Sequence, residues 1–253
     1  MIDTHCHVHD RAFDADRDEV IARAREAGVG AMITIGENLD DSRTAVDAAQ
    51  RYGICAAVGI HPHEAAKAPS DIEARLKPLL ARAGVVALGE IGLDYYYDRS
   101  PRDVQTEVFT QQLRIGREAG VPIVFHQRDA FEDFTAVLRR EWRPGMRGVV
   151  HCFTGTPGQA RTYVDEFGLF LGIGGVLTFP KAQEVRDAVR EVGLRAIVLE
   201  TDCPYLAPVP KRGKRNEPAY VTYTAAKLAE LLNLSLAEVA ATSDANATTL
   251  FGI

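Results

Sequence analysis

Residues 85–126 read VVALGEIGLDYYYDRSPRDVQTEVFTQQLRIGREAGVPIVFH, which predicts a strand, a helix and a second strand in succession. The apolar runs over 85–91 and 121–126 have the length and the β-branched content of buried strands. The stretch over 103–119 has the composition of a helix and ends just before Gly120. Buried strands that alternate with helices predict βαβ units and therefore a parallel sheet.

The same alternation continues on both sides of this segment until eight strand–helix units are complete. Eight units predict an α/β protein with the (β/α)8 TIM-barrel fold, which commonly occupies about 250 residues as a single domain. We therefore expect a single domain over residues 1–253. An open, doubly wound sheet is the alternative, but no Gly-x-Gly-x-x-Gly turn follows the first strand. The predicted strands cover 1–6, 31–35, 54–59, 85–91, 121–126, 148–151, 169–174 and 196–200, and the helices 17–27, 41–52, 71–83, 103–119, 131–140, 157–167, 183–192 and 218–232.

One further helix is predicted after Asn233, at the end of the sequence. Ser235 has the residue type of an N-cap, and Glu238 stands three positions later, where a capping box needs a carboxylate. We expect this helix to be an addition to the barrel.

Composition and charge limit the classes of protein. Of the residues 46% are hydrophobic and 25% charged, ordinary values for a globular chain, and no run approaches the roughly 20 apolar residues of a membrane span. The first residues have neither the basic nor the apolar region of a secretory signal, so we expect a cytoplasmic protein. We also expect it to be a monomer. The four cysteines form no C-x-x-C pair, which predicts free thiols. A net charge of −6 argues against a broad nucleic-acid groove but permits a local phosphate site.

The histidines have a distribution that points to function. Every one of the seven falls at or just after the end of a predicted strand. In barrels of this kind that face carries the active site. In the His5-Cys6-His7 segment both imidazoles are expected on one side of the strand and Cys6 on the other. The seven are His5, His7 and His9 after the first strand, His61 and His63 after the third, His126 after the fifth and His151 after the sixth.

Two carboxylates complete a set of metal-binding side chains at the same face. Glu90 ends an apolar run that otherwise reads as wholly buried, and a charge there needs a partner or a metal. Asp202 follows the eighth strand, which neighbours the first in a closed sheet. One cation takes about three or four ligands, so six donors favour two divalent metals that share a carboxylate, and Glu90 is the expected bridge. The six are His5, His7, Glu90, His126, His151 and Asp202.

With these residues assembled, the whole chain resembles the TatD family of metal-dependent deoxyribonucleases, within the wider amidohydrolase-type metal barrels. The resemblance implies that His5, His7, Glu90 and Asp202 hold one metal and that Glu90, His126 and His151 hold the other. Neither the fourth nor the fifth strand contains a lysine, the residue that bridges the ions in other metal barrels. The motifs that carry the resemblance are IDTHCH (2–7), VGIHPH (58–63), GEIGLDY (89–95), His126, VHCFTG (150–155) and LETDCPYL (199–206).

The resemblance also implies a phosphodiester hydrolase, and we expect a DNA exonuclease that works 3′–5′ and prefers single strands. Members of the family are reported as magnesium-dependent, whereas four imidazoles would by themselves favour zinc, manganese or iron. We therefore rank magnesium or manganese first and keep zinc open. Asp202 is the expected acceptor of the proton of the attacking water, and His61 is expected to reach the scissile phosphate, although Pro62 could direct either neighbouring ring there.

Two loops at the barrel mouth are candidate substrate contacts. The tyrosine triplet over 95–97, with Tyr95 first, could stack on bases or simply pack against the next loop. The basic run over 211–215 could bind phosphate or be a solvated loop, and the resemblance extends to Arg215 within it.

Two other functions share this architecture. Hydrolases of amides, esters or lactones, including enzymes that deacylate charged tRNA, can have nearly the same ligands, so DNA ends and small phosphodiesters are not the only substrates to consider. A non-catalytic binding or scaffold protein is the third interpretation. The complete ligand set argues against it.

Overall fold

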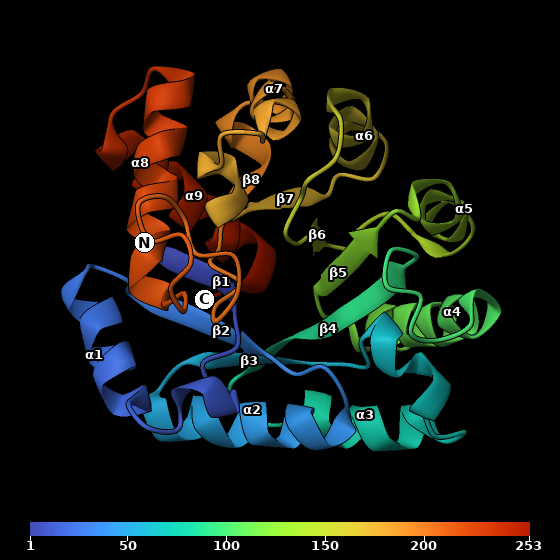
Figure 1. The fold of residues 1–253 in the computed structure, drawn as a ribbon. Coiled ribbons are helices and arrows are strands. Elements are labelled where there is room, and N and C mark those ends of the chain that lie inside the picture. Colours follow the sequence, from blue (N-terminus) through green and yellow to red (C-terminus); the bar gives the residue numbers. More distant parts are fainter. The chain divides into compact units, whose positions relative to one another are not determined.

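The computed structural model describes residues 1–253 and contains eight strands in one parallel sheet, in the order β1 to β8. Helices alternate with the strands along the chain (Figure 1). The strands are β1 (Ile2–Cys6), β2 (Ala31–Ile35), β3 (Cys55–Val58), β4 (Val85–Asp94), β5 (Ile123–Arg128), β6 (Gly148–Val150), β7 (Phe170–Ile173) and β8 (Ile197–Leu199). The helices are α1 (Arg17–Glu26), α2 (Leu39–Tyr52), α3 (Ile72–Leu80), α4 (Arg102–Ala119), α5 (Phe131–Glu141), α6 (Pro157–Arg161), α7 (Gln183–Val192), α8 (Val221–Leu232) and α9 (Leu236–Phe251).

The chain forms two compact units. Unit 1 contains Met1–Thr34 together with His151–Ile253, and unit 2 contains Ile35–Val150. None of the helices is both long and apolar enough to span a bilayer. All four cysteines are free thiols, as the sequence predicts.

Unit 2 is held together by close packing of α4 and α5 on its strands. Phe109 of α4 stacks on Phe134 of α5 with ring centroids 5.2 Å apart, and both meet the ring of Phe125 of β5 edge-on. At Gly116 a Cβ would lie 2.3 Å from Ile123 Cδ1, so any larger residue would require this side chain to shift. These contacts fix the strand ends that carry the unit's polar side chains.

Strand β4 is longer than the sequence predicts, because it continues past Ile91 to Asp94. Its pairing with β5 shifts register between Leu88 and Ile91 and then runs on to Asp94 and Arg128. Such an irregularity turns side chains that regular alternation would place elsewhere. A Cβ at Gly92 would lie 1.9 Å from the backbone oxygen of His126, so glycine is required for this close pairing. The extension carries the buried carboxylate of Asp94 to the end of the strand, four residues after the buried carboxylate of Glu90.

In unit 1 the first strand lies beside the segment that follows the last strand. The amide of Asp202 donates to the backbone oxygen of His5 at 2.8 Å, and the amide of His7 donates to that of Cys203 at 2.8 Å. The buried carboxylate of Asp3 accepts from the Thr201 amide at 2.9 Å and from its hydroxyl at 2.6 Å. Burial, only partly offset by the bonds from Thr201, raises the pKa of Asp3 to about 7.

Helix α9 is the predicted additional helix, and its capping box between Ser235 and Glu238 is present. It contacts both β1 and β8. Its Asp244 carboxylate accepts from the amide of Ile2 at 2.8 Å, and the amide nitrogen of Asn246 donates to Ile197 O at 2.8 Å. The helix therefore fastens the starts of the two strands whose ends bear His5 and Asp202.

The single helix predicted over 157–167 is divided. Helix α6 ends at Arg161, and Thr162–Glu166 form a wider π-helical turn. The wider turn places the ring of Tyr163 fully inside the unit, edge-on to Phe153 at 6.2 Å between centroids. Apolar periodicity does not distinguish a π turn from an α turn of this length, so the sequence pattern could not reveal it.

Candidate metal centre

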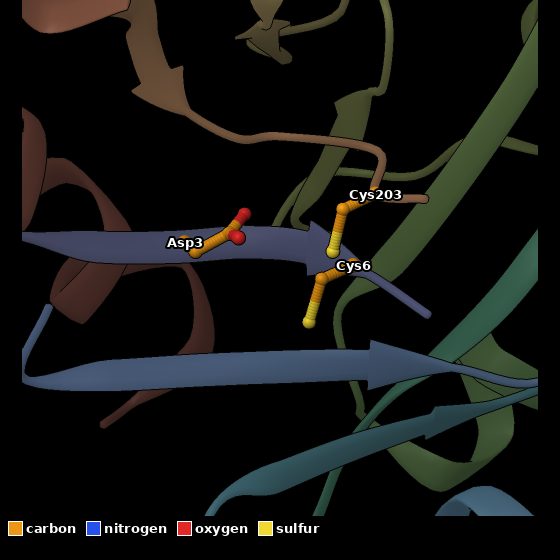
Figure 2. A group of neighbouring side chains, drawn as sticks. All are labelled: Asp3, Cys6 and Cys203. Atoms are coloured by element: carbon orange, nitrogen blue, oxygen red, sulfur yellow. The ribbon is translucent and has the colours of Figure 1, made fainter. Parts of the chain in front are cut away.

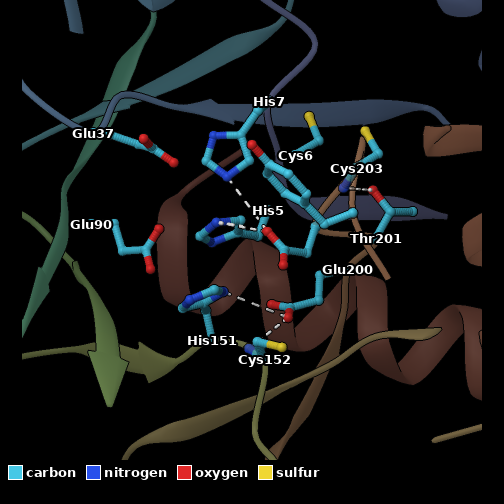
Figure 3. Close-up of polar contacts among 12 residues, drawn as sticks. His5, Cys6, His7, Glu37, Glu90, His151, Cys152, Glu200, Thr201 and Cys203 are labelled. Atoms are coloured by element: carbon cyan, nitrogen blue, oxygen red, sulfur yellow. Dashed lines mark hydrogen bonds and ion pairs between the residues drawn. The ribbon is translucent and has the colours of Figure 1, made fainter. Parts of the chain in front are cut away.

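Unit 1 brings together three imidazoles and one carboxylate at the ends of β1, β6 and β8 (Figure 3). The rings of His5 and His151 stack with centroids 3.9 Å apart, and those of His5 and His7 are 5.1 Å apart. Asp202 Oδ1 lies 3.7 Å from His5 Nε2 and 3.4 Å from His7 Nε2. The expectation that both rings of the His5-Cys6-His7 segment face one side agrees with this arrangement.

Asp202 is ionised at neutral pH in this surrounding. Burial alone would raise the pKa of Asp202, but its contact with His7 and the neighbouring rings of His5 and His151 bring that pKa below its usual value. The backbone at Asp202 has φ of +56°, a conformation that few non-glycine residues adopt. It is held by the hydrogen bond that the Asp202 amide donates to His5 O. The carboxylate is thus charged and fixed in place.

Glu200 is a buried acid that the sequence interpretation did not single out. Its Oε1 accepts from the Cys152 amide at 2.6 Å and lies 3.8 Å from His151 Nδ1 (Figure 3). Its Oε2 is buried without a hydrogen-bond partner, and a Cβ at Gly172 would lie 2.1 Å from it. Burial raises the pKa of Glu200 to about 8. The signal in the sequence was the same as for Glu90, a carboxylate that ends an apolar strand.

Asp3, Cys6 and Cys203 form a second cluster in unit 1 (Figure 2). Ligating atoms of Asp3, Cys6 and Cys203 all lie within 4.8 Å of one another. Both oxygens of Asp3 are already bonded to Thr201, and the Cys6 thiol donates to Ile33 O at 3.3 Å. The cluster therefore ties β1 to its neighbours and holds the backbone from which His5 and His7 project.

Unit 2 carries the other candidate ligands at the ends of β3, β4 and β5. Glu90 Oε1 lies 2.7 Å from His126 Nδ1 and 3.5 Å from His61 Nε2. On the other side of the same ring, Asp94 Oδ2 lies 2.9 Å from His126 Nε2. It also lies 3.0 Å from His63 Nε2. Asp94 thus pairs with both His126 and His63.

The charge states of this group follow from its contacts. Burial would lower the pKa of His126, but its hydrogen bonds to Asp94 and Glu90 raise it to about 9. Burial lowers the pKa of His61 to about 4, so that ring is neutral at pH 7. His61 Nδ1 accepts from the His63 amide at 3.0 Å, which leaves the proton on Nε2, the nitrogen that faces Glu90.

These donors fit divalent metal ions. Without a metal, a protonated His126 neutralises the carboxylates on either side of it, so this position selects for a positive charge. A cation bound there would take the place of that proton. Imidazole nitrogens and carboxylate oxygens are the donors that magnesium, manganese and zinc take from proteins. Ligating atoms gather within 4.8 Å in the groups His5–His151–Asp202 and His61–Glu90–His126.

Arg215 and Tyr95, the two predicted substrate contacts, both have partners within the protein. The guanidinium of Arg215 donates to both carboxylate oxygens of Asp16, at 2.8 and 2.6 Å, and to Ala12 O at 2.6 Å. The hydroxyl of Tyr95 donates to Asp133 at 2.8 Å, and Arg102 lies 4.3 Å over its ring. The roles of Arg215 and Tyr95 in binding substrate remain predictions.

Comparison with known proteins places the chain among enzymes. A family model described as TatD related DNase matches residues 2–252. The chain is 39% identical to an uncharacterized metal-dependent hydrolase, YabD of Bacillus subtilis, with 100% of this chain and 99% of YabD covered. It is 40% identical to a protein named 3′-5′ ssDNA/RNA exonuclease TatD, from Cronobacter sakazakii, with 99% and 97% covered.

A solved structure shows the same fold. The crystal structure of YjjV, a TatD homologue from Escherichia coli, superposes with a TM-score of 0.93 at 32% identity and covers 100% of this chain and 98% of its own. Together with the strand order, this likeness confirms the predicted (β/α)8 fold class.

Proposed function

The chain belongs to the TatD-related DNase family, and on that premise we propose that it is a metal-dependent hydrolase that removes nucleotides from the end of a DNA strand. The observation that carries the proposal is the gathering of buried imidazoles and carboxylates at the strand ends of both units. The name of the Cronobacter sakazakii relative, a 3′-5′ exonuclease on single-stranded DNA and RNA, supports the same activity.

The proposed ligand set has two ions. His5, His7, Glu90 and Asp202 would hold one, and Glu90, His126 and His151 the other, with magnesium or manganese first among the candidates and zinc open. Two such ions supply positive charge to the phosphate and acidify a water molecule at neutral pH. The donor types and their burial support this set, and the sharing of Glu90 rests on the family resemblance.

The chain's own residues would perform three tasks in this reaction. Asp202, ionised and fixed by its backbone, would accept the proton of the attacking water. His61, neutral with its proton on Nε2, would donate a hydrogen bond to a phosphate oxygen. Asp94 would orient His126, because a carboxylate bonded to one ring nitrogen fixes the direction of the other.

The experiment that tests the function compares a linear single-stranded DNA with the same strand closed into a circle. The purified protein is incubated with each, in Mg²⁺, in Mn²⁺ or with chelator, and the products are resolved by length. We expect stepwise shortening of the linear strand, an intact circle and no reaction with chelator. Labels at the two ends report the direction of shortening, which we expect to be 3′–5′.

The same experiment has outcomes that would overturn the proposal. Equal cutting of the circle and the linear strand would make the protein an endonuclease. Cleavage of neither would favour the hydrolases of amides or esters, including charged tRNA, that share this kind of ligand set. Tight metal binding with no turnover of any ester would indicate a binding protein.

The basic loop over 211–215 provides a further prediction about how the strand is held. Since the net charge is −6, few cations are available for phosphate, and Lys211, Arg212 and Lys214 are not in ion pairs as Arg215 is. Replacing these three by alanine should raise KM for an oligonucleotide about tenfold. It should also flatten the salt dependence by about 0.7 per lost contact.

Turnover of a small activated phosphodiester should not change in that variant, because it has one phosphate only. The matched control removes Arg161, Arg190 and Arg195, three exposed cations of unit 1 that each pair with a carboxylate. Equal effects of the two triple variants would mean that net charge alone matters. The role of Arg215 is tested separately, because its loss also breaks the pair with Asp16.

A further inference from the structure

Two tyrosines after β4 are exposed although their backbone is firmly held. Tyr96 is 57% exposed and Tyr97 is 51% exposed, among the largest apolar side chains open to solvent. Their rings meet edge to face with centroids 4.8 Å apart, and about half of each side chain remains open to solvent. Large aromatic surface left in water is a typical mark of a binding site.

The loop that carries the pair is preorganised. Asp94 Oδ1 accepts from the amides of Tyr96 at 3.0 Å and Tyr97 at 2.8 Å. The buried side chain of Gln105 accepts from the Asp94 amide and donates to Asp94 O and to Ser100 O. Both ends of the loop are therefore fixed to α4, and binding would cost little ordering of the chain.

Positive charge lies directly over these rings. The guanidinium of Arg128 is 3.8 Å from the ring centroid of Tyr96 and 4.9 Å from that of Tyr97, and Arg99 lies 5.2 Å from Tyr97. Neither arginine forms an ion pair, although most arginines of this acidic chain do. A planar cation beside open aromatic rings attracts a flat, electron-rich partner that is attached to a negative charge.

The pair is also coupled to the candidate ligands of the same unit. The ring of Tyr97 meets the ring of His63 edge-on at 5.5 Å between centroids. The carboxylate of Asp94 contacts His63 and His126 through one oxygen and both tyrosine amides through the other. The side chain of Asp94 therefore links the aromatic surface directly to His126, a proposed metal ligand.

From this arrangement we propose that Tyr96, Tyr97 and Arg128 form a platform on which unpaired nucleobases next to the cleaved phosphate stack. The inference rests on the proposed nuclease function and specifies its substrate as a strand whose terminal bases are free. Stacking on aromatic rings accepts every base, because each has a π face, and it excludes bases that are already stacked in a duplex. The platform would therefore give preference for single strands without preference for sequence.

The test replaces both tyrosines by leucine and, separately, both by phenylalanine. With a single-stranded oligonucleotide, Tyr96→Leu/Tyr97→Leu should raise KM at least tenfold and change kcat less than threefold. A tenfold change corresponds to about 1.4 kcal/mol, within the range for one base stacked on an aromatic ring. The phenylalanine pair should stay within twofold of the unchanged protein, because it keeps the rings.

The decisive substrate is an oligonucleotide with abasic sites at the end that is cleaved. For the unchanged protein, the KM of this abasic substrate should be as high as the KM of the leucine variant for the ordinary strand. For the leucine variant, the KM of the abasic substrate should be no higher than that of the ordinary strand. Tyr52→Leu is the matched control, because Tyr52 also lies under an arginine, at the end of α2. It should leave KM unchanged.

Binding of a fluorescein-labelled phosphorothioate strand, measured by anisotropy, separates the two hypotheses. If the protein binds this strand but cleaves no nucleic acid, the proposed function is wrong, and the platform is judged by whether the leucine pair weakens Kd tenfold. If the protein cleaves DNA and the leucine pair retains normal KM and Kd, the platform is wrong. Loss of affinity for the abasic and the base-bearing strand alike would also overturn it.

Discussion

Glu90→Gln is expected to lower kcat/KM on DNA by a thousandfold or more while the fold remains intact. Glu90 is only 3% exposed and lies 2.7 Å from His126 and 3.5 Å from His61, so its charge is concentrated on the candidate ligands. Glutamine has the same shape but no charge to attract a cation. A loss of about 4 kcal/mol of transition-state stabilisation corresponds to roughly a thousandfold in rate.

The measurement pairs kinetics with metal content and thermal unfolding. The variant should bind less metal per chain and unfold at nearly the same temperature, since glutamine can keep a hydrogen bond to His126. Glu132→Gln is the matched control, because it removes an equal charge from an exposed position of α5 and should change nothing. Near-normal turnover with full metal content would contradict the assignment of Glu90.

Asp202→Asn is expected to produce a loss of similar size from the other unit. The change removes the ionised group that contacts His5 and His7 and that we propose as the proton acceptor. Asparagine keeps the shape but cannot accept the proton, so kcat should fall a thousandfold or more and KM should change little. Asp165→Asn, an exposed pair partner of Arg195, is the control.

The two variants combined test whether the residues of unit 1 and unit 2 serve one reaction. Groups that act as one catalytic assembly are strongly non-additive, so the double variant should be about as inactive as either single one. If the two losses in kcat/KM multiplied instead, Glu90 and Asp202 would act in independent steps. Metal content of the double variant should fall below that of each single variant.

The sequence alone predicted the fold class and nearly all strand and helix positions, because alternation of apolar strands and helices is a local signal. It also predicted which histidines lie at strand ends, since that follows from the same pattern. It did not predict the bulge in β4, because a shift in register depends on how closely His126 of β5 approaches Gly92. The placement of Asp94 against His126 follows from that shift.

The sequence also did not predict contacts between side chains that lie far apart along the chain. Arg215 was predicted as a candidate substrate contact, and the structure shows that it also forms a bidentate pair with Asp16. The two residues are 199 positions apart, so no local pattern in the sequence predicts this pair. In the tyrosine triplet the first ring was favoured, whereas a bond to Asp133 occupies its hydroxyl and the next two rings are the exposed ones. Which side chains are paired and which are exposed depends on tertiary contacts.

Unit 1 is formed from two separate segments of the chain, so it cannot be completed until the second segment has been synthesised. On the ribosome, His5 and His7 emerge early, but His151 and Asp202 emerge only after the whole of Ile35–Val150 has been made. At about 5–20 residues per second, the wait from His7 to Asp202 is on the order of 10–40 s. Unit 2, a single continuous segment, can collapse during that interval. A chain that ends before Asp202 would therefore lack one of the carboxylates of the candidate metal centre, and unit 1 would remain incomplete.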